Sequence, residues 1–235
     1  ELGFDPRRLA QIDRHFAGYV DDGRLPGWLV LIARNERIVH LSTYGRRDIE
    51  ADLPVEVDTR WRIYSMTKPI TSVAAMSFYE EGAFELKDPV SRFIPSFAGV
   101  QVHGAGPAAE PVRMWHLLTH TSGLTYGFHH ASPVDELYRE AGFDLQRPDI
   151  DLAEACDRWA SLPLLFEPGS EWNYGVSTDV LGRVVEVLAG APLDDALRAR
   201  VFDPLGMADT AFHVTDEQRP QLAALYAPGA GTPTR

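Results

Sequence analysis

One short β-hairpin constrains the fold of this chain more than any other feature. The segment "GWLVLIARNERIVHLSTYG" predicts a strand over residues 28–33, a turn over 34–37 and a return strand over 38–44. Both strands are rich in apolar residues, and a two-stranded sheet alone is only marginally stable in water. The fold therefore needs other elements that cover this hairpin and further strands that pair with it.

Outside the hairpin, the sequence predicts mainly helices. Apolar side chains recur at helical spacing over residues 5–21, and a second helix is expected over residues 66–81, where Gly82 can end it. The buried face of that second helix should comprise Ile70, Val73, Ala74, Ser77 and Phe78. Further helical segments are expected near residues 88–94, 112–119, 133–141, 151–161, 176–190 and 193–202, whereas residues 45–60, which include Pro54, should form a loop.

The charge of the chain argues against some classes of partner. The 235 residues include 22 basic and 34 acidic side chains, a formal net charge of −12, so binding to nucleic acid through phosphates is not expected. No apolar run is long enough to cross a bilayer, and the first residues lack the pattern of a signal peptide. We expect a cytoplasmic protein without a membrane partner, with an already removed leader as the alternative.

Cys156, the single cysteine, should be a small buried residue.

Lysine is scarce in this chain, which contains twenty arginines but only two lysines. One of the two, Lys68, follows Ser65 by three residues at the start of the second expected helix, on the same helix face. A serine hydroxyl becomes a nucleophile when a base takes its proton, which a lysine can do and an arginine cannot. Pro69 places Ser65 at the helix start, where free N–H groups can stabilise an oxyanion. The alternative is a helix cap followed by a solvated lysine.

A tyrosine precedes a later amphipathic helix. In "FEPGSEWNYGVSTDVLGRVVEVLAG", Tyr174 lies in a turn just before the apolar periodicity begins. A loop tyrosine beside Ser65 and Lys68 can carry a proton between the serine oxygen and a leaving group. The alternative is an aromatic side chain that packs at the entrance of a helix.

Four sequence blocks together resemble one protein superfamily. "WRIYSMTKPIT", "MWHLLTHTSGL", the block around Tyr174 and "VFDPLGMADTAF" follow one another over residues 61–212. This order resembles the serine β-lactamase and penicillin-binding-protein superfamily, whose first motif is Ser-x-x-Lys. The nearest resemblance is to the bacterial family VIII carboxylesterases, which are class C β-lactamase-like. It implies an α/β plus all-α fold, with an antiparallel sheet flanked by helices and a helical subdomain.

The resemblance assigns roles to individual residues. It implies that Ser65 is the acylated nucleophile, Lys68 its base partner and Tyr174 the proton relay, while Tyr126 binds substrate at the mouth of the pocket. It implies neither a metal nor a cofactor. One departure is Val176, which stands where the β-lactamase motif Tyr-x-Asn has its asparagine. The amide that contacts a β-lactam is therefore missing, which resembles the esterase branch.

A second departure concerns the last part of the family's fold. The resemblance implies a third motif on a strand beside the nucleophile, whose N–H completes the oxyanion hole, and residues 213–235 do not contain it. We therefore expect residues 1–85 to form the N-terminal part of the α/β domain, residues 86–212 a helical subdomain, with Ser65 in the cleft between them, and residues 213–235 a linker. The missing strands should lie past Arg235 or on a second chain made by cleavage in "APGAGTPTR", so residues 1–235 alone should not form a competent enzyme.

The reaction that the resemblance implies is hydrolysis of a small-molecule carboxylic ester, with a short acyl group, through an acyl-enzyme on Ser65. Alternatives within the superfamily are a β-lactamase, a D-Ala-D-Ala carboxypeptidase and an acyltransferase. The alternative from another class is a non-catalytic binding or sensor domain of the same fold.

His116 and His120 stand at i and i+4 but lack the glutamate of a zinc-protease helix, so we expect core or cap histidines there.

Overall fold

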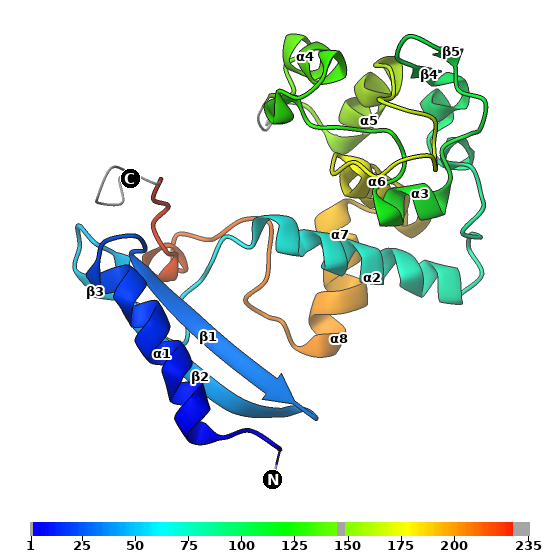
Figure 1. The fold of residues 1–235 in the computed structure, drawn as a ribbon. Helices are drawn as coiled ribbons and strands as arrows, with labels where there is room; N and C mark the ends of the chain where they lie inside the picture. The colour runs from blue at the N-terminus through cyan, green and yellow to red at the C-terminus, as the bar shows by residue number, and fades with distance from the viewer. Residues whose placement is uncertain (1, 145–148, 228–235) are drawn as a thin grey trace. The chain divides into compact units, whose positions relative to one another are not determined.

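The computed structural model describes residues 2–144 and 149–227, which divide into two compact units (Figure 1). One unit comprises residues 1–63 and 212–235, and the other comprises residues 64–211. The second predicted helix packs among the later helices and belongs to the second of these units. The domain division expected for the whole protein stays a prediction, and residues 228–235 of the expected linker lie outside the described residues.

The first unit begins with the predicted helix, α1 (Pro6–Asp21). Pro6 occupies the first helical position, and the Asp5 side chain caps the helix by accepting a hydrogen bond from the N–H of Arg7. Polar contacts join α1 to the hairpin, since the Asp13 carboxylate accepts a hydrogen bond from the Ser42 hydroxyl (2.6 Å) and pairs with His40 (2.8 Å). The helix therefore covers one face of the hairpin.

The hairpin has the predicted form, with β1 (Gly27–Arg34) antiparallel to β2 (Arg37–Asp48). The two turn residues, Asn35 and Glu36, have φ angles of 50° and 60°, as a type I′ turn requires. The expected loop over residues 45–60 is wrong in part, because β2 continues to Asp48 and β3 (Leu53–Pro54) pairs with it. Pro54 is compatible with this position because an edge strand needs no N–H there.

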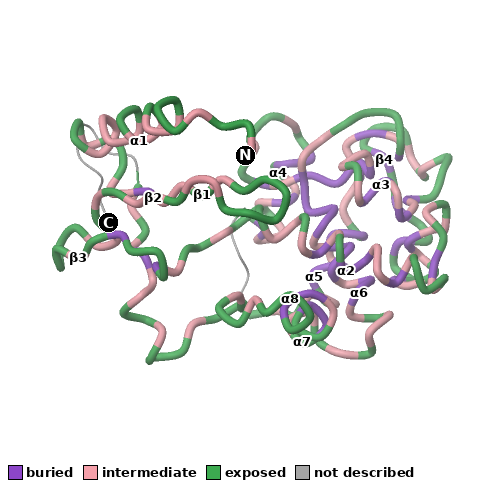
Figure 2. Tube along the Cα trace, turned by 90° about the horizontal axis from the view of Figure 1, so that it is seen from below, coloured by how far each residue is buried: buried purple, intermediate pink, exposed green. Residues whose placement is uncertain are grey.

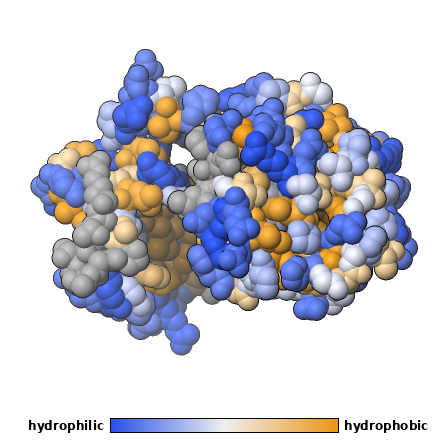
Figure 3. Space-filling view, turned by 90° about the horizontal axis from the view of Figure 1, so that it is seen from above, coloured by the Kyte–Doolittle hydropathy of each residue, from blue (hydrophilic) through white to orange (hydrophobic). Residues whose placement is uncertain are grey.

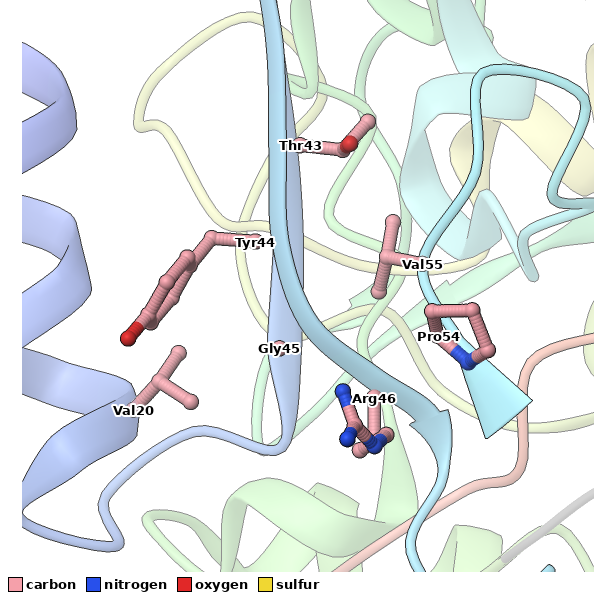
Figure 4. Close-up of a pocket in the computed structure, with 7 residues that line it drawn as sticks. All are labelled: Val20, Thr43, Tyr44, Gly45, Arg46, Pro54 and Val55. Atoms are coloured by element: carbon pink, nitrogen blue, oxygen red, sulfur yellow. The ribbon is translucent and has the colours of Figure 1, made fainter. Parts of the chain in front are cut away.

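A glycine near the end of the hairpin permits a close approach of two chain segments. Gly45 has a φ angle of 81°, and a Cβ atom there would lie only 2.4 Å from the carbonyl oxygen of Pro26. The surface beside it is a pocket lined by Val20, Thr43, Tyr44, Gly45, Arg46, Pro54 and Val55 (Figure 4). The Tyr44 hydroxyl donates to Asp21 and the Arg46 guanidinium to Asp52, so both groups already have partners.

Few side chains of the first unit are fully buried. Within its described residues these are Trp28, Val55, Thr59 and Ala223. Three apolar side chains of the hairpin, Leu31, Ile38 and Leu41, are 51%, 61% and 42% exposed. This exposure agrees with the argument that the hairpin needs more strands, but their origin in a later segment or a second chain stays a prediction.

The second unit is built around α2 (Thr67–Glu80), which follows one 3-10 turn at Tyr64–Met66. As predicted, Gly82 ends the helix with a positive φ angle of 75°. The predicted buried face is wrong at Val73, which is 56% exposed. Ala74 and Phe78 are buried as predicted, together with Thr71 and Ala75, because the neighbouring α6 (Ser177–Ala189) covers that side of the helix.

The other predicted helical segments also form. They contain α3 (Met114–Thr119), α4 (Pro133–Glu140), α5 (Leu152–Ser161) and α7 (Leu193–Leu197) with a π-helical turn (Arg198–Phe202). The segment near residues 88–94 forms only a 3-10 turn (Val90–Arg92), and α8 (Asp203–Leu205), which was not predicted, follows the last segment. Two short strands, β4 (Gln101–Val102) and β5 (Gly106–Pro107), pair with each other. Figure 2 shows buried residues concentrated on α2, α3, α5 and α6. Cys156 is among them, as predicted. In the part of the chain that the structure describes, no helix is long and apolar enough to cross a membrane.

Candidate active site

Ser65 lies exposed in the 3-10 turn that leads into α2. The preceding residue, Tyr64, has a φ angle of 43°, in the left-handed region that bulky residues rarely adopt. Such backbone strain is concentrated at functional sites. No sequence pattern indicated it, because tyrosine is not a residue associated with this conformation.

Two side chains from separate elements meet at the Ser65 oxygen. The Tyr174 hydroxyl donates a hydrogen bond to Ser65 Oγ at 2.6 Å, although 109 residues separate the two. Lys68, one helical turn after the serine, donates to the same oxygen from Nζ at 3.4 Å. The Lys68 ammonium also lies 4.7 Å from the centroid of the Tyr174 ring. The three residues predicted from the sequence are therefore brought together within the second unit.

Glycine and asparagine hold the loop that carries Tyr174. Gly175 packs so closely on the next loop that a Cβ atom there would lie 2.4 Å from the carbonyl oxygen of Leu124. The Asn173 side chain donates to that same oxygen at 3.1 Å, and the Asn173 N–H donates to the carbonyl of His120 at 2.9 Å. The position of Tyr174 thus depends on backbone contacts that a side chain at position 175 would disrupt.

Tyr126 lies beside this cluster, on the loop that follows α3. Its ring centroid is 5.6 Å from that of Tyr174, and the Lys68 ammonium is 5.7 Å from its centre. A fully buried carboxylate supports the loop, since Asp135 accepts hydrogen bonds from the Thr125 hydroxyl and from the N–H groups of Ala131 and Ser132. The predicted substrate-binding residue is therefore next to the predicted catalytic residues.

Asp179, which the sequence analysis did not single out, lies under this cluster on the first turn of α6. Its Oδ2 accepts a hydrogen bond from the Tyr126 hydroxyl at 3.4 Å. Burial raises the pKa of the Asp179 carboxyl, against the opposing effect of the Lys68 charge. Burial and Asp179 together raise the pKa of Tyr126, which keeps that phenol protonated. Only the tertiary structure brings Asp179, on the first turn of α6, next to Tyr126.

The pKa of Tyr174 changes in the opposite direction. Burial acts to raise it, but the hydrogen bonds with Lys68 and Ser65 and the charge of Lys68 outweigh burial, so the pKa falls below its ordinary value. Of the two tyrosines, Tyr174 is therefore the better suited to accept and return a proton near neutral pH.

The two histidines have the predicted structural roles, and one has a further contact. His116 is buried, accepts a hydrogen bond from the N–H of Arg113, and has a pKa lowered to about 4 by burial and by the nearby Arg113 charge. His120 ends α3 with a φ angle of 56°, and its ring centroid lies 4.9 Å from that of Tyr174. Among the described residues, no group of three or more His, Cys, Asp or Glu side chains is placed to hold a metal ion.

The raised pKa of Asp179 predicts an effect on stability. In the unfolded chain this carboxyl ionises at its ordinary pKa, whereas in the folded protein it holds its proton to higher pH. The folding stability that this difference contributes is full below the unfolded pKa and is lost as pH rises through the folded pKa. Asp179→Asn should therefore raise the urea midpoint at pH 7 and have little effect at pH 3.

Urea unfolding at both pH values tests this, with Asp157→Asn, an exposed acid on α5, as the matched control. A lower midpoint for Asp179→Asn at pH 7 would mean that attraction to Lys68 outweighs the cost of burial.

Comparisons with known proteins place these observations in context. A family model described as Beta-lactamase matches residues 12–235. Esterase EstB of Burkholderia gladioli is 39% identical over 228 residues, and Protein Rv1367c of Mycobacterium tuberculosis is 39% identical over 214 residues. Among solved structures, EstCE1, described as a hydrolase with promiscuous acyltransferase activity, has a TM-score of 0.87 and 34% identity.

These matches cover most of this chain but only part of each relative. The alignments include 96% of this chain and 56% of EstB, 88% and 52% for Rv1367c, and 97% and 58% for EstCE1. The chain thus spans about half the length of the curated relatives it matches. The fold predicted from the sequence, an α/β part with a helical subdomain, is confirmed by these matches.

Proposed function

Because this chain belongs to the Beta-lactamase family, we propose that it is a serine hydrolase that cleaves carboxylic esters through an acyl-enzyme on Ser65. The observation that carries the proposal is the contact of one serine oxygen with both the Tyr174 hydroxyl (2.6 Å) and the Lys68 amine (3.4 Å). A serine that acts only as a helix cap has no need for either partner. The name of the relative EstB supports an ester as the substrate.

In the proposed acylation step, Ser65 Oγ attacks the ester carbonyl carbon while its proton passes to the Tyr174–Lys68 pair. Lys68 is the general-base partner, and Tyr174, with its lowered pKa, carries the proton. The negative charge that forms on the carbonyl oxygen is stabilised by backbone N–H groups at the entrance of α2. The carbon–oxygen bond to the alcohol then breaks, and Tyr174 returns the proton to the departing alkoxide.

Deacylation repeats these steps with water in place of the serine. Water attacks the acyl carbonyl carbon, and its proton passes to the same pair. The bond to Ser65 Oγ then breaks, the serine regains a proton, and the carboxylic acid leaves. No metal or cofactor enters these steps, and the exposed position of Ser65 leaves room for water to approach.

We expect the complete protein to hydrolyse esters and to turn over β-lactams little or not at all. Val176 stands where a β-lactamase has a side-chain amide, and this valine is buried in the core of the second unit, so it offers no polar contact to a substrate. The test is to compare kcat/KM for p-nitrophenyl butyrate with that for nitrocefin. Equal values would favour a β-lactamase instead.

Tyr174→Phe should lower kcat/KM for p-nitrophenyl butyrate by about 10²-fold, the lower part of the range for a lost acid–base group, because Lys68 still reaches the serine. Steady-state kinetics measures the effect. Tyr79→Phe is the matched control, since residue 79 lies about 16 Å along α2 from Lys68. Unchanged kinetics in Tyr174→Phe would remove the phenol from the mechanism.

Acyl transfer is the second candidate activity, favoured by the description of EstCE1. An alcohol that takes the place of water in deacylation would yield a new ester. The measurement is the ratio of ester to acid formed from vinyl butyrate when a primary alcohol is added. Formation of acid alone at high alcohol concentration would restrict the activity to hydrolysis.

The alternative of a non-catalytic binding or sensor domain predicts a different result. Such a domain can bind or slowly react with an acyl compound, but it does not turn over. A fluorophosphonate probe that labels the protein, without any ester hydrolysis above background, would favour that alternative over the proposed esterase.

A further inference from the structure

Five aromatic side chains form a continuous series around the Ser65 oxygen. In order of contact they are Phe128, Tyr126, Tyr174, His120 and Trp172, and we name this series the aromatic arc. Successive ring centroids lie 4.8, 5.6, 4.9 and 6.4 Å apart. The hydroxyl of the central ring, Tyr174, contacts Ser65 Oγ. An ester whose carbonyl carbon reaches that oxygen therefore lies beside Tyr174, the middle ring of the series.

Both ends of the aromatic arc are open to solvent. Phe128 is 48% exposed and Trp172 is 67% exposed. Figure 3 shows apolar side chains at the molecular surface among charged and polar ones, and isolated exposed apolar residues need no explanation. These two differ because each continues a row of ring contacts that leads to the proposed nucleophile. Because neither ring is buried in the core, core packing does not explain why these two residues are aromatic.

The aromatic arc is also held in place by the backbone. Its rings come from the end of α3, from the following loop and from the loop before α6, and those segments are joined by the Asn173–His120 and Asn173–Leu124 hydrogen bonds. The stacked pair Tyr126 and Phe128 has an interplanar angle of only 19°. Rigid, preorganised rings bind a flat partner at low entropic cost.

Charge decides what kind of group fits. Aromatic faces attract cations, but the side-chain nitrogen of Lys68 already lies 4.7 Å and 5.7 Å from the two tyrosine rings. Lys68 carries a positive charge once it has taken the serine proton, so a second cation beside the rings would be repelled during acylation. The net charge of −12 disfavours a polyanionic substrate. Charge therefore favours a neutral group, and among neutral groups a planar one can stack on these rings.

We infer that the aromatic arc binds a neutral aromatic ring of the ester substrate, carried on either its alcohol or its acyl side. The inference rests on the proposed function and specifies its substrate class. Stacked and edge-to-face ring pairs contribute beyond the area that they bury, whereas a saturated ring of the same size contributes burial alone.

Two pairs of matched esters test the inference in the complete protein. Benzyl acetate against cyclohexylmethyl acetate examines the alcohol side, and methyl phenylacetate against methyl cyclohexylacetate examines the acyl side. In each pair a methylene separates the ring from the reacting group, so intrinsic reactivity is similar. We expect kcat/KM to favour the aromatic member by about 2- to 10-fold in at least one pair.

Variants then locate the effect. Phe128→Leu and Trp172→Leu keep an apolar side chain but remove a ring, and the double variant should lower the ratio, since only the three inner rings remain. Trp172→Phe keeps a ring and should preserve the preference. Leu205→Ala, which removes an exposed apolar side chain from α8, is the control and should leave the ratio unchanged.

Three outcomes separate this inference from the proposed function. Hydrolysis of all four esters without aromatic preference overturns the aromatic arc as a subsite, as does a preference that the double leucine variant leaves undiminished. Binding of the same esters to Ser65→Ala, measured by saturation-transfer NMR, needs no turnover. If the wild type hydrolyses no ester, the proposed function fails. Tighter binding of benzyl acetate than of cyclohexylmethyl acetate to Ser65→Ala would still support the subsite.

Discussion

Ser65→Ala should reduce ester hydrolysis by at least about 10⁴-fold and abolish labelling by a fluorophosphonate probe, because the acyl-enzyme needs the Oγ atom. The residue is exposed, and within the described part of the chain its hydroxyl forms hydrogen bonds with Tyr174 and Lys68 alone, so the fold should tolerate its loss. Intact-protein mass spectrometry after incubation with the probe measures labelling, and p-nitrophenyl butyrate hydrolysis measures turnover.

Ser96→Ala is the matched control, since Ser96 is an exposed serine in a 3-10 turn (Pro95–Gly99) of the same unit. It should keep both labelling and turnover. Equal rates of probe uptake in the Ser65→Ala variant and the wild type would assign the nucleophile to another residue. A melting temperature unchanged from wild type would show that lost activity in Ser65→Ala reflects chemistry and not unfolding.

Lys68→Arg is the second change with a large expected effect, a loss of about 10³- to 10⁴-fold in kcat/KM that nearly matches the loss in Lys68→Ala. Arginine keeps the positive charge that lowers the pKa of Tyr174, but it cannot take a proton from the serine. Comparing Lys68→Arg with Lys68→Ala therefore separates the role of Lys68 as a base from its role as a positive charge. Steady-state kinetics with p-nitrophenyl butyrate, across pH 5–9, provides the comparison.

The chain offers a close control, because its second lysine, Lys87, is exposed and Lys87→Arg makes the same chemical change. That variant should keep wild-type kinetics. If Lys68→Arg also kept them, Lys68 would act through its charge alone, and Tyr174 with its lowered pKa would be the base.

The local features of this fold could be read from the sequence because each depends on neighbours in the chain. Helical periodicity predicts α1, and periodicity together with Pro69 in the first turn and Gly82 after the last turn predicts α2, each within a residue or two. The same holds for the proximity of Ser65 and Lys68, which follows from the i, i+3 spacing of a helix. Which side of α2 is buried was predicted less well, since it depends on where α6 packs, and Val73 is exposed as a result.

The sequence by itself determined the helices, the hairpin and the placement of a serine and a lysine at one helix entrance, because backbone geometry over a few residues decides these. It indicated Tyr174 by its place in a turn before a helix and by resemblance, and Tyr126 by resemblance alone. Only the tertiary structure decided that Tyr174 reaches Ser65, that Asp179 lies against Tyr126 and that His120 and Trp172 continue the ring contacts. Those contacts depend on how closely loops that are distant in the sequence pack together. At Gly175 the packing leaves no space for even one Cβ atom, so a side chain there would push the two loops apart.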